Sequence, residues 1–464
     1  MSGRFRSILL AVRSSYWFIP SLMALAAVLL GAGMVWLDVR LGTGWMEGVS
    51  WYQQIGVDGA REVLSTIAGS MITVAGVVFS ITIVALSYAS SQYGPRVLTN
   101  FMTDRGNTVT LGTFIATFLY CLVVLRTIHG GDDDFVPQLS VVGALLLAIC
   151  SIAVLIYFIH HVPQTIHINH VVAHIGERLI ADAAERFPAL IGEAPDEQVR
   201  PVAPLGRSWA TVASAATGYL QSIDEEALMH LARRHDVLVR LRYRPGDFAM
   251  KGRGLADISP AERLDDDVAA KLRACFTTGK KRTPEDDIMF LVSELVEIAA
   301  RALSPGVNDP MTAVTCLDWL GAGASEFASR QLPHPVRVDE DGRARVLALP
   351  ADLAHFLDSA FGWLRHYVAP DMIAGLHFLR VLGEVGAACR QPEQLALLQS
   401  QARHFAALAG ERLSGEDRDA VLGRAAELQT LLEEDPRHID ERQARWLGGS
   451  AEPALRGAQC RPFG

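Results

Sequence analysis

The sequence lacks the short motifs that mark the common catalytic folds. It contains no GxxxxGK[ST] phosphate-binding loop, no GxGxxG run after a strand, no HExxH zinc motif and no GxSxG nucleophile elbow. These absences exclude the usual nucleotide-binding, zinc-protease and hydrolase patterns. We therefore expect no catalytic residues, and we expect that the chain is not an enzyme.

The chain also contains few cysteines, and its net charge is negative. The 464 residues include six cysteines, at positions 121, 150, 275, 316, 389 and 460, and no two of them have a CxxC or zinc-ribbon spacing. We expect no disulfide framework, no cysteine metal site and no cofactor. The formal net charge of -9 argues against a general nucleic-acid binder.

Long uncharged runs, in contrast, are abundant before residue 160. The stretch from Val63 to Pro95 contains no Asp, Glu, Lys, Arg or His. A bilayer core needs about 20 apolar residues as a helix, so this stretch is long enough to cross a membrane. Its small and hydroxylated residues recur at steps of seven, with Ile83 interrupting one series: Thr66, Gly69, Thr73, Gly76, Ser80, Ser87 and Ser90.

Residues at these spacings share one face of a helix, which is narrow and mildly polar. Two interpretations stay open. The face either lets another helix backbone approach closely, or it lines a water path with hydroxyl groups in a symmetric assembly.

Three further runs have the length and composition of membrane spans. Together with the first they predict a transmembrane domain over residues 1–161, with spans at about 16–37, 63–91, 109–128 and 139–159. The arginines concentrate before the first span and between the second and third, so we expect both termini to be cytoplasmic and the chain to be a multi-pass protein of the inner membrane.

The turn between the third and fourth spans is acidic and should lie outside. Asp132, Asp133 and Asp134 either raise the local cation concentration at an outer mouth or form an ordinary solvated turn. Arg126, close to the end of the third span, is an interface anchor or a charge beside an ion path.

A histidine series follows the fourth span. His160, His167, His170 and His174 share one face if the chain stays helical. Three interpretations compete: a polar face at the membrane boundary, a pH sensor, since histidine titrates near neutral pH, and a metal site with helically spaced ligands.

The rest of the chain reads as a mainly helical cytoplasmic region. We expect a juxtamembrane helix and linker over residues 162–204, a small α/β subdomain over 205–283 and a helical subdomain over 284–464. In the small subdomain we expect helices at 209–223 and 225–234, the second capped by Asp224. Alternating residues predict β-hairpins that turn at Pro245-Gly246-Asp247 and at Asp341-Gly342.

One run between two predicted helices is rich in residues that end and start helices: Ser304, Pro305, Gly306, Asn308, Asp309 and Pro310. Asp309 is a good N-cap, and Pro310 suits the first helical position. The run is either a rigid corner between helices or a set of amide groups presented to an anion.

Four segments together resemble a known family: VVFSITIVALSYASSQYGPRVL, FIHH, RPGDF and ARALSPGVNDPMTAVTCLDWL. The chain is similar here to the bacterial membrane proteins known as the domain of unknown function 2254 family. The resemblance implies a four-span inner-membrane protein with a cytoplasmic C-terminal region and no established reaction.

We hypothesise an oligomeric ion channel or ion-translocating protein, with its path along the second span and a regulatory cytoplasmic domain. Its partners would be the lipid bilayer, further copies of the chain and ions, and no nucleic acid. The alternative is a membrane-anchored signalling or scaffold protein without transport.

Overall fold

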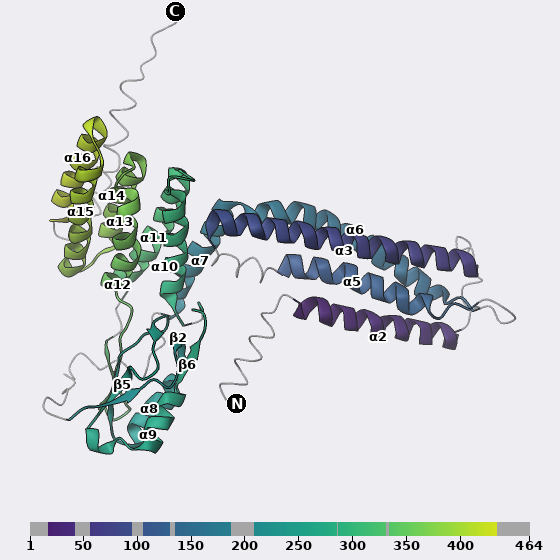
Figure 1. The fold of residues 1–464 in the computed structure, drawn as a ribbon, viewed down its shortest axis with the longest axis horizontal. Coiled ribbons are helices and arrows are strands. Elements are labelled where there is room, and N and C mark those ends of the chain that lie inside the picture. Colours follow the sequence, from purple (N-terminus) through teal and green to yellow (C-terminus); the bar gives the residue numbers. More distant parts are fainter. Residues whose placement is uncertain are drawn as a thin grey trace, which may run out of the picture. The chain divides into compact units, whose positions relative to one another are not determined.

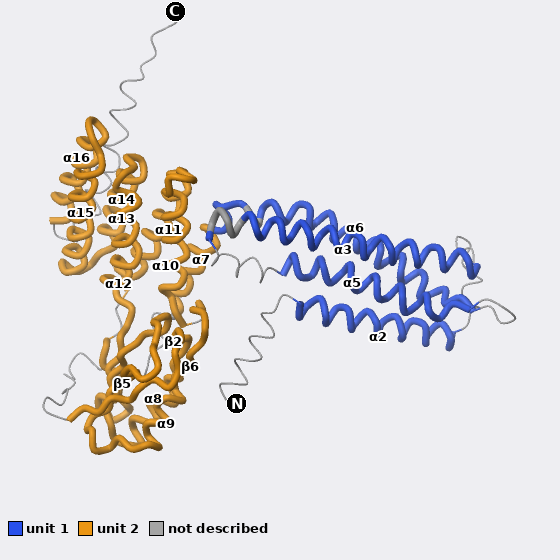
Figure 2. Tube along the Cα trace, in the orientation of Figure 1, with its two compact units in different colours: residues 1–171 blue, residues 172–464 orange. Residues whose placement is uncertain are grey.

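A computed structural model describes residues 17–41, 56–94, 105–129, 135–186, 208–284, 286–330 and 334–433. The chain divides into two compact units, residues 1–171 and 172–464 (Figure 2). The predicted fold class is confirmed, because four N-terminal helices are long and apolar enough to cross a membrane and a mainly helical region with small sheets follows them.

The first unit is built from the four candidate spans. They are α2 (Phe18–Leu41), α3 (Val57–Tyr93), α5 (Arg105–Leu125) and α6 (Gln138–Ile166), which run side by side in Figure 1. Helices α3 and α6 extend beyond the predicted boundaries at both ends, α2 at its C-terminal end and α5 at its N-terminal end. A helix satisfies its own backbone groups and can continue past the apolar run into polar sequence.

Helix α5 is the most enclosed of the four. Of its most apolar window 44% is buried within the first unit, compared with 17% for α2. Small residues allow this close packing: Gly31 of α2 lies against Val123, and a side chain at Gly112 of α5 would meet Met23. Close approach at small residues is the usual way in which membrane helices associate.

The second unit includes most of helix α7 (Ile168–Arg186), which packs on α11 (Pro310–Ser329). Gly176 faces the Trp319 ring, and Gly323 faces Leu179. Farther along, Arg330 donates a 3.1 Å hydrogen bond to the Ala184 carbonyl.

Two small sheets and two helices form the β-containing part. The five-stranded sheet has the order β1-β5-β3-β8-β7 and the three-stranded sheet the order β4-β2-β6. The elements are β1 (Ala210–Ala213), β2 (Gly218–Ile223), α8 (Glu225–Arg234), β3 (Leu238–Leu241), β4 (Phe248–Ala249), β5 (Gly254–Ser259), η1 (Ala261–Arg263), α9 (Asp266–Ala274), β6 (Phe276–Gly279), β7 (Val336–Val338) and β8 (Ala344–Leu347).

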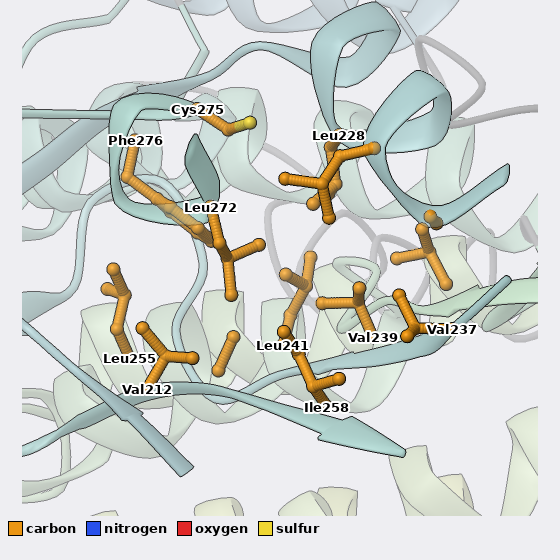
Figure 3. Packing of buried hydrophobic residues seen from close by; sticks show 14 of the residues in the cluster. Val212, Leu228, Val237, Val239, Leu241, Leu255, Ile258, Leu272, Cys275 and Phe276 are labelled. Atoms are coloured by element: carbon orange, nitrogen blue, oxygen red, sulfur yellow. The ribbon is translucent and has the colours of Figure 1, made fainter. Parts of the chain in front are cut away.

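The core of this part lies under α8 and α9. Figure 3 shows Val239, Leu241 and Ile258 of the sheet directed toward Leu228 and Leu272 of the helices. Asp224 caps α8 as predicted, since its carboxylate accepts a 3.0 Å hydrogen bond from the amide of Ala227.

Two predictions for this part were wrong in detail. The segment 209–223, expected to be a helix, instead forms two strands, β1 and β2, which lie in different sheets. Each pairs with a strand from later in the sequence. The first hairpin also differs, because β4, which follows the Pro245-Gly246-Asp247 turn, pairs with β2, while β3 pairs with β5. The hairpin of β7 and β8 is confirmed.

The remaining elements are helices, as predicted. They are α10 (Ile288–Ala302), α11, α12 (Leu353–Leu357), a π-helical turn η2 (Asp358–Gly362), α13 (Trp363–Val368), α14 (Met372–Ala388), α15 (Pro392–Arg412) and α16 (Gly415–Leu432). Phenylalanines fill their core, with Phe378 in ring contact with both Phe361 and Phe405.

Candidate functional site

The stripe of small and hydroxylated residues lies on the outward face of α3. Six of its members are exposed in the single chain: Thr66, Gly69, Thr73, Gly76, Ser80 and Ser87. The side chain of the seventh, Ser90, lies outside the described residues. A Cβ atom added at Gly69 or Gly76 would meet no atom within 4 Å.

The opposite face of α3 supplies its packing within the chain. The buried residues there are mostly apolar: Leu64, Ala68, Met71, Ala75, Val78 and Ala85. At 3.6 residues per turn, these positions point away from the stripe. The stripe therefore makes no helix contact inside the described part of the first unit.

The stripe combines hydroxyl groups with open glycine positions. Thr73 donates a 2.8 Å hydrogen bond to the carbonyl of Gly69 one turn earlier. This bond satisfies the hydroxyl proton in an apolar environment and leaves oxygen lone pairs free to accept from water. Chemically, the face can pack closely against another helix or line a water path.

A second set of polar contacts, not predicted from the sequence, fastens α2 to α6. The Asp38 carboxylate, 9% exposed, accepts from the amides of Leu139 and Ser140 at 2.9 Å and from the Ser140 hydroxyl at 2.6 Å. It thus caps a helix about 100 residues away in sequence. The hydropathy pattern that identifies the two spans does not indicate which residues of one helix contact the other.

Other hydroxyls cross-link the interior of the first unit. Thr117 of α5 and Ser151 of α6 lie 2.9 Å apart, and Tyr120 donates to the Ser140 carbonyl at 3.0 Å. These bonds join α5 to α6 at two levels and hold the register of the pair.

The acidic turn lies outside the described residues, so the structure places none of Asp132, Asp133 and Asp134. Arg126 is exposed in the turn that follows α5. Beside it, Arg61 at the start of α3 donates a 3.1 Å hydrogen bond to the Ile128 carbonyl.

The histidine series is not one continuous helical face. All four of its residues are exposed, but helix α6 ends before His167, whose backbone is extended with φ -64° and ψ 125°, and α7 begins after it. The condition for a shared face of His160, His167, His170 and His174 therefore fails at His167. His170 and His174 remain one turn apart on α7, and His160 lies 3.1 Å from the Gln164 amide.

The corner between α10 and α11 has the predicted helix start. The Asp309 carboxylate accepts from the Thr312 amide at 3.1 Å and from its hydroxyl at 2.6 Å, and Pro310 occupies the first helical position. Asn308 has a positive φ of 51°, which lets its amide bond to Ser304 at 2.9 Å. Pro305 and Gly306 are exposed at the tip.

Two buried carboxylates in the β-containing part are held by arginines. Asp287, whose side chain is 3% exposed, lies 2.7 Å from Arg282. Burial raises the pKa of Asp287 against the opposing attraction of Arg282. Asp257, 1% exposed, is held by both Arg240 and Arg242. Among the residues that the structure describes, no three His, Cys, Asp or Glu side chains gather as metal ligands.

Comparison with known proteins gives one family and a set of relatives. A model of the predicted membrane proteins DUF2254 matches residues 13–384. Uncharacterized proteins of Mycobacterium bovis and Mycobacterium tuberculosis are each 31% identical to the chain over 444 residues, which is 93% of this chain and 84% of theirs. No solved structure matches the chain.

Proposed function

We propose that this chain, which belongs to the DUF2254 family of predicted membrane proteins, has a transport function. In this proposal several copies of the chain assemble in the bacterial inner membrane around α3. The α3 helices contribute a path for ions, and the second unit regulates it. The proposal involves no catalysed reaction and no nucleic acid.

The outward direction of the stripe is the observation that carries this proposal. A helix that faces lipid gains nothing from glycine, which costs about 1 kcal/mol relative to alanine in a helix interior. Yet Gly69 and Gly76 have open space in the single chain, beside the exposed hydroxyls of Thr73 and Ser80. A second copy of α3, or water held between copies, gives these residues a role.

The orientation follows from the basic residues. Arginines gather before α2 and between α3 and α5, so we propose that both termini and the second unit are cytoplasmic. The acidic turn after α5 then lies at the outer surface, where carboxylates favour cations over anions.

The test compares glycine substitutions on two exposed membrane-helix positions. At Gly76 on α3 and at Gly33 on α2, an added Cβ would meet no atom of the described residues within 4 Å, so we compare Gly76→Leu with Gly33→Leu. If copies meet at the stripe, Gly76→Leu should lower the yield of the oligomer in detergent or the ion flux per particle in liposomes at least several-fold. Gly33→Leu should leave both unchanged.

Hydroxyl substitutions distinguish a path from a packing face. Ser80→Leu should reduce ion flux while the oligomer persists, and Ile81→Leu, rotated by about 100° on the same helix, should not. Loss of assembly with unchanged flux per intact particle would make the stripe a packing face and favour a membrane-anchored scaffold. A wild-type protein that is monomeric in bilayers would contradict the proposal altogether.

A further inference from the structure

The face of the five-stranded sheet opposite the α8–α9 core carries two half-exposed arginines. Arg240 and Arg242 lie two residues apart on β3 and its continuation, so both side chains leave the sheet on the side away from the α8–α9 core. Their side chains are 46% and 45% exposed. In a chain with a formal net charge of -9, this is a local concentration of positive charge.

Both guanidinium groups are fixed by one buried carboxylate. Asp257 on the neighbouring strand β5 accepts from Nε and Nη2 of Arg240 at 2.9 and 2.7 Å. It also accepts from Nε and Nη2 of Arg242 at 2.9 and 2.7 Å. The Thr211 hydroxyl on β1 donates to the same carboxylate at 2.7 Å.

Further contacts hold the two arginines flat. The Trp209 ring lies 4.5 Å from the guanidinium carbon of Arg240, a cation–π arrangement. Arg242 lies over Gly254, where an added Cβ would come within 3.0 Å of Nη1. Burial raises the pKa of Asp257, but hydrogen bonds from Arg242, Thr211 and Arg240 outweigh it and hold this pKa below its ordinary value. The carboxylate therefore stays charged at neutral pH.

The charges in this cluster do not cancel. One carboxylate meets two guanidinium groups, which leaves one net positive charge. Within the described residues, no hydrogen bond uses Nη1 of either arginine, so each retains an N–H edge. The two side chains are half exposed and are already held in place by Asp257, which removes part of the entropic cost of association.

We infer that Arg240 and Arg242 form a binding site for a phosphate group on the face of β3 opposite the α8–α9 core. The Nε–Nη2 fork of each arginine already holds Asp257, so a ligand would meet the remaining Nη1 edges. A carboxylate ligand offers two acceptor oxygens in one plane, whereas a phosphate group offers at least three oxygens in a tetrahedron and can accept from both Nη1 edges at once. The phosphate group belongs to a soluble metabolite or to a lipid headgroup. The inference does not depend on ion transport, since the site lies in the second unit and binding is measured directly.

The test titrates inorganic phosphate and pyrophosphate into the full chain in phosphatidylcholine nanodiscs. Binding is followed by calorimetry and by tryptophan fluorescence, with Trp209→Phe identifying the part of the signal that comes from the site. Chloride at equal ionic strength serves as the reference. We expect a saturable response with phosphate that chloride does not reproduce.

Two variants remove the site in different ways. The triple change Arg240→Gln, Arg242→Gln and Asp257→Asn removes all three charges together, so no buried carboxylate is left unpaired. Arg240→Lys with Arg242→Lys keeps the charge and the fold but loses the planar forks. Each should weaken phosphate binding at least tenfold. The control removes an exposed ion pair of the same unit, Arg233→Gln with Glu340→Gln, and should bind as the wild type does.

Nanodiscs that contain phosphatidic acid separate the two sources. If a lipid headgroup occupies the site, the response to soluble phosphate will be absent in these discs and present in phosphatidylcholine discs. If it persists in both, the ligand is soluble. An equal phosphate response in the wild type and the lysine variant, or a response that chloride reproduces, would overturn the inference.

Discussion

At the scale of single residues, Gly246 shows how one position fixes the RPGDF turn. Its φ of 96° lies in the region that favours glycine, and its amide donates to the Leu220 carbonyl at 2.7 Å. A Cβ atom there would lie 2.3 Å from the buried carboxylate of Asp287. The turn is thus packed against the Arg282–Asp287 ion pair.

We expect Gly246→Ala to destabilise the second unit by about 3 kcal/mol or more, because strain at positive φ adds to a clash with a buried charge. Gly252→Ala is the matched control, since its φ is also positive, at 82°, but an added Cβ meets nothing within 4 Å. Gly252→Ala should lower the stability only by the energy of backbone strain at positive φ. Hydrogen exchange or thermal unfolding of the full chain in detergent measures the difference, and equal losses in the two variants would show that Asp287 does not restrict this turn.

The pH dependence of stability should depend on Asp236. Hydrogen bonds from Arg345 and Arg263, with attraction to both, lower its pKa from 3.8 to about 2. Because the folded-state pKa lies below the unfolded-state value, the stabilisation is complete above about pH 4 and is lost as the pH falls through 2.

Asp236→Asn removes this charge, and asparagine tolerates the φ of 47° at this position. Since the carboxylate is half exposed, we expect a loss of about 1 kcal/mol at pH 7, which shrinks between pH 4 and pH 3. The exposed Asp341→Asn is the control. A difference between wild type and Asp236→Asn that stays constant down to pH 3 would contradict the assignment.

At the scale of elements, the pairing of α7 with α11 carries the next prediction. A Cβ atom added at Gly176 would lie only 2.2 Å from Cδ2 of the Trp319 ring. A side chain at this position therefore fits only if the ring or one of the helices moves. Gly176→Ala should therefore destabilise the second unit by about 1–3 kcal/mol through overpacking.

The control for this prediction is the same substitution in an open helix position. An added Cβ at Gly423 of α16 meets nothing within 4 Å, so Gly423→Ala should be neutral or stabilise by up to about 1 kcal/mol. Limited proteolysis and thermal unfolding of the full chain compare the two. If both alanines stabilise, α7 and α11 are not held at this contact.

The elements that sequence reasoning identified are those with a strong local period. The heptad step of Thr66, Thr73 and Ser80 depends on one helix alone, so the shared face could be predicted, but its outward direction depends on how α3 packs. The segment 209–223 was mistaken for a helix because its strands are defined by partners far away, Asp257 opposite Thr211 and Thr278 opposite Leu220. Similarly, no spacing rule connects Asp38 with Ser140.

At the scale of the whole molecule, a membrane unit with an unpartnered polar stripe is joined through α7 to a unit with its own core. The outward direction of the stripe and the pairing of the two arginines with Asp257 each depend on how the chain folds, so the sequence alone indicates neither. The family and the four spans, in contrast, could be recognised from uncharged runs and short motifs, because a bilayer imposes the same length on every crossing helix.

The topology gives the last prediction. Four spans would place both termini on one side of the membrane, and the arginine bias predicts that this side is the cytoplasm. In a variant whose native cysteines are replaced, Asp133→Cys in the acidic turn should react with an impermeant maleimide in intact spheroplasts. Gly423→Cys on the open surface of α16 should react only after lysis. The reverse pattern would place the second unit outside the cell, and labelling of both sites in intact spheroplasts would require an odd number of crossings. Either result would remove the cytoplasmic regulatory role from the proposed function, whereas the expected pattern puts the phosphate site of Arg240 and Arg242 in contact with the phosphate compounds of the cytoplasm.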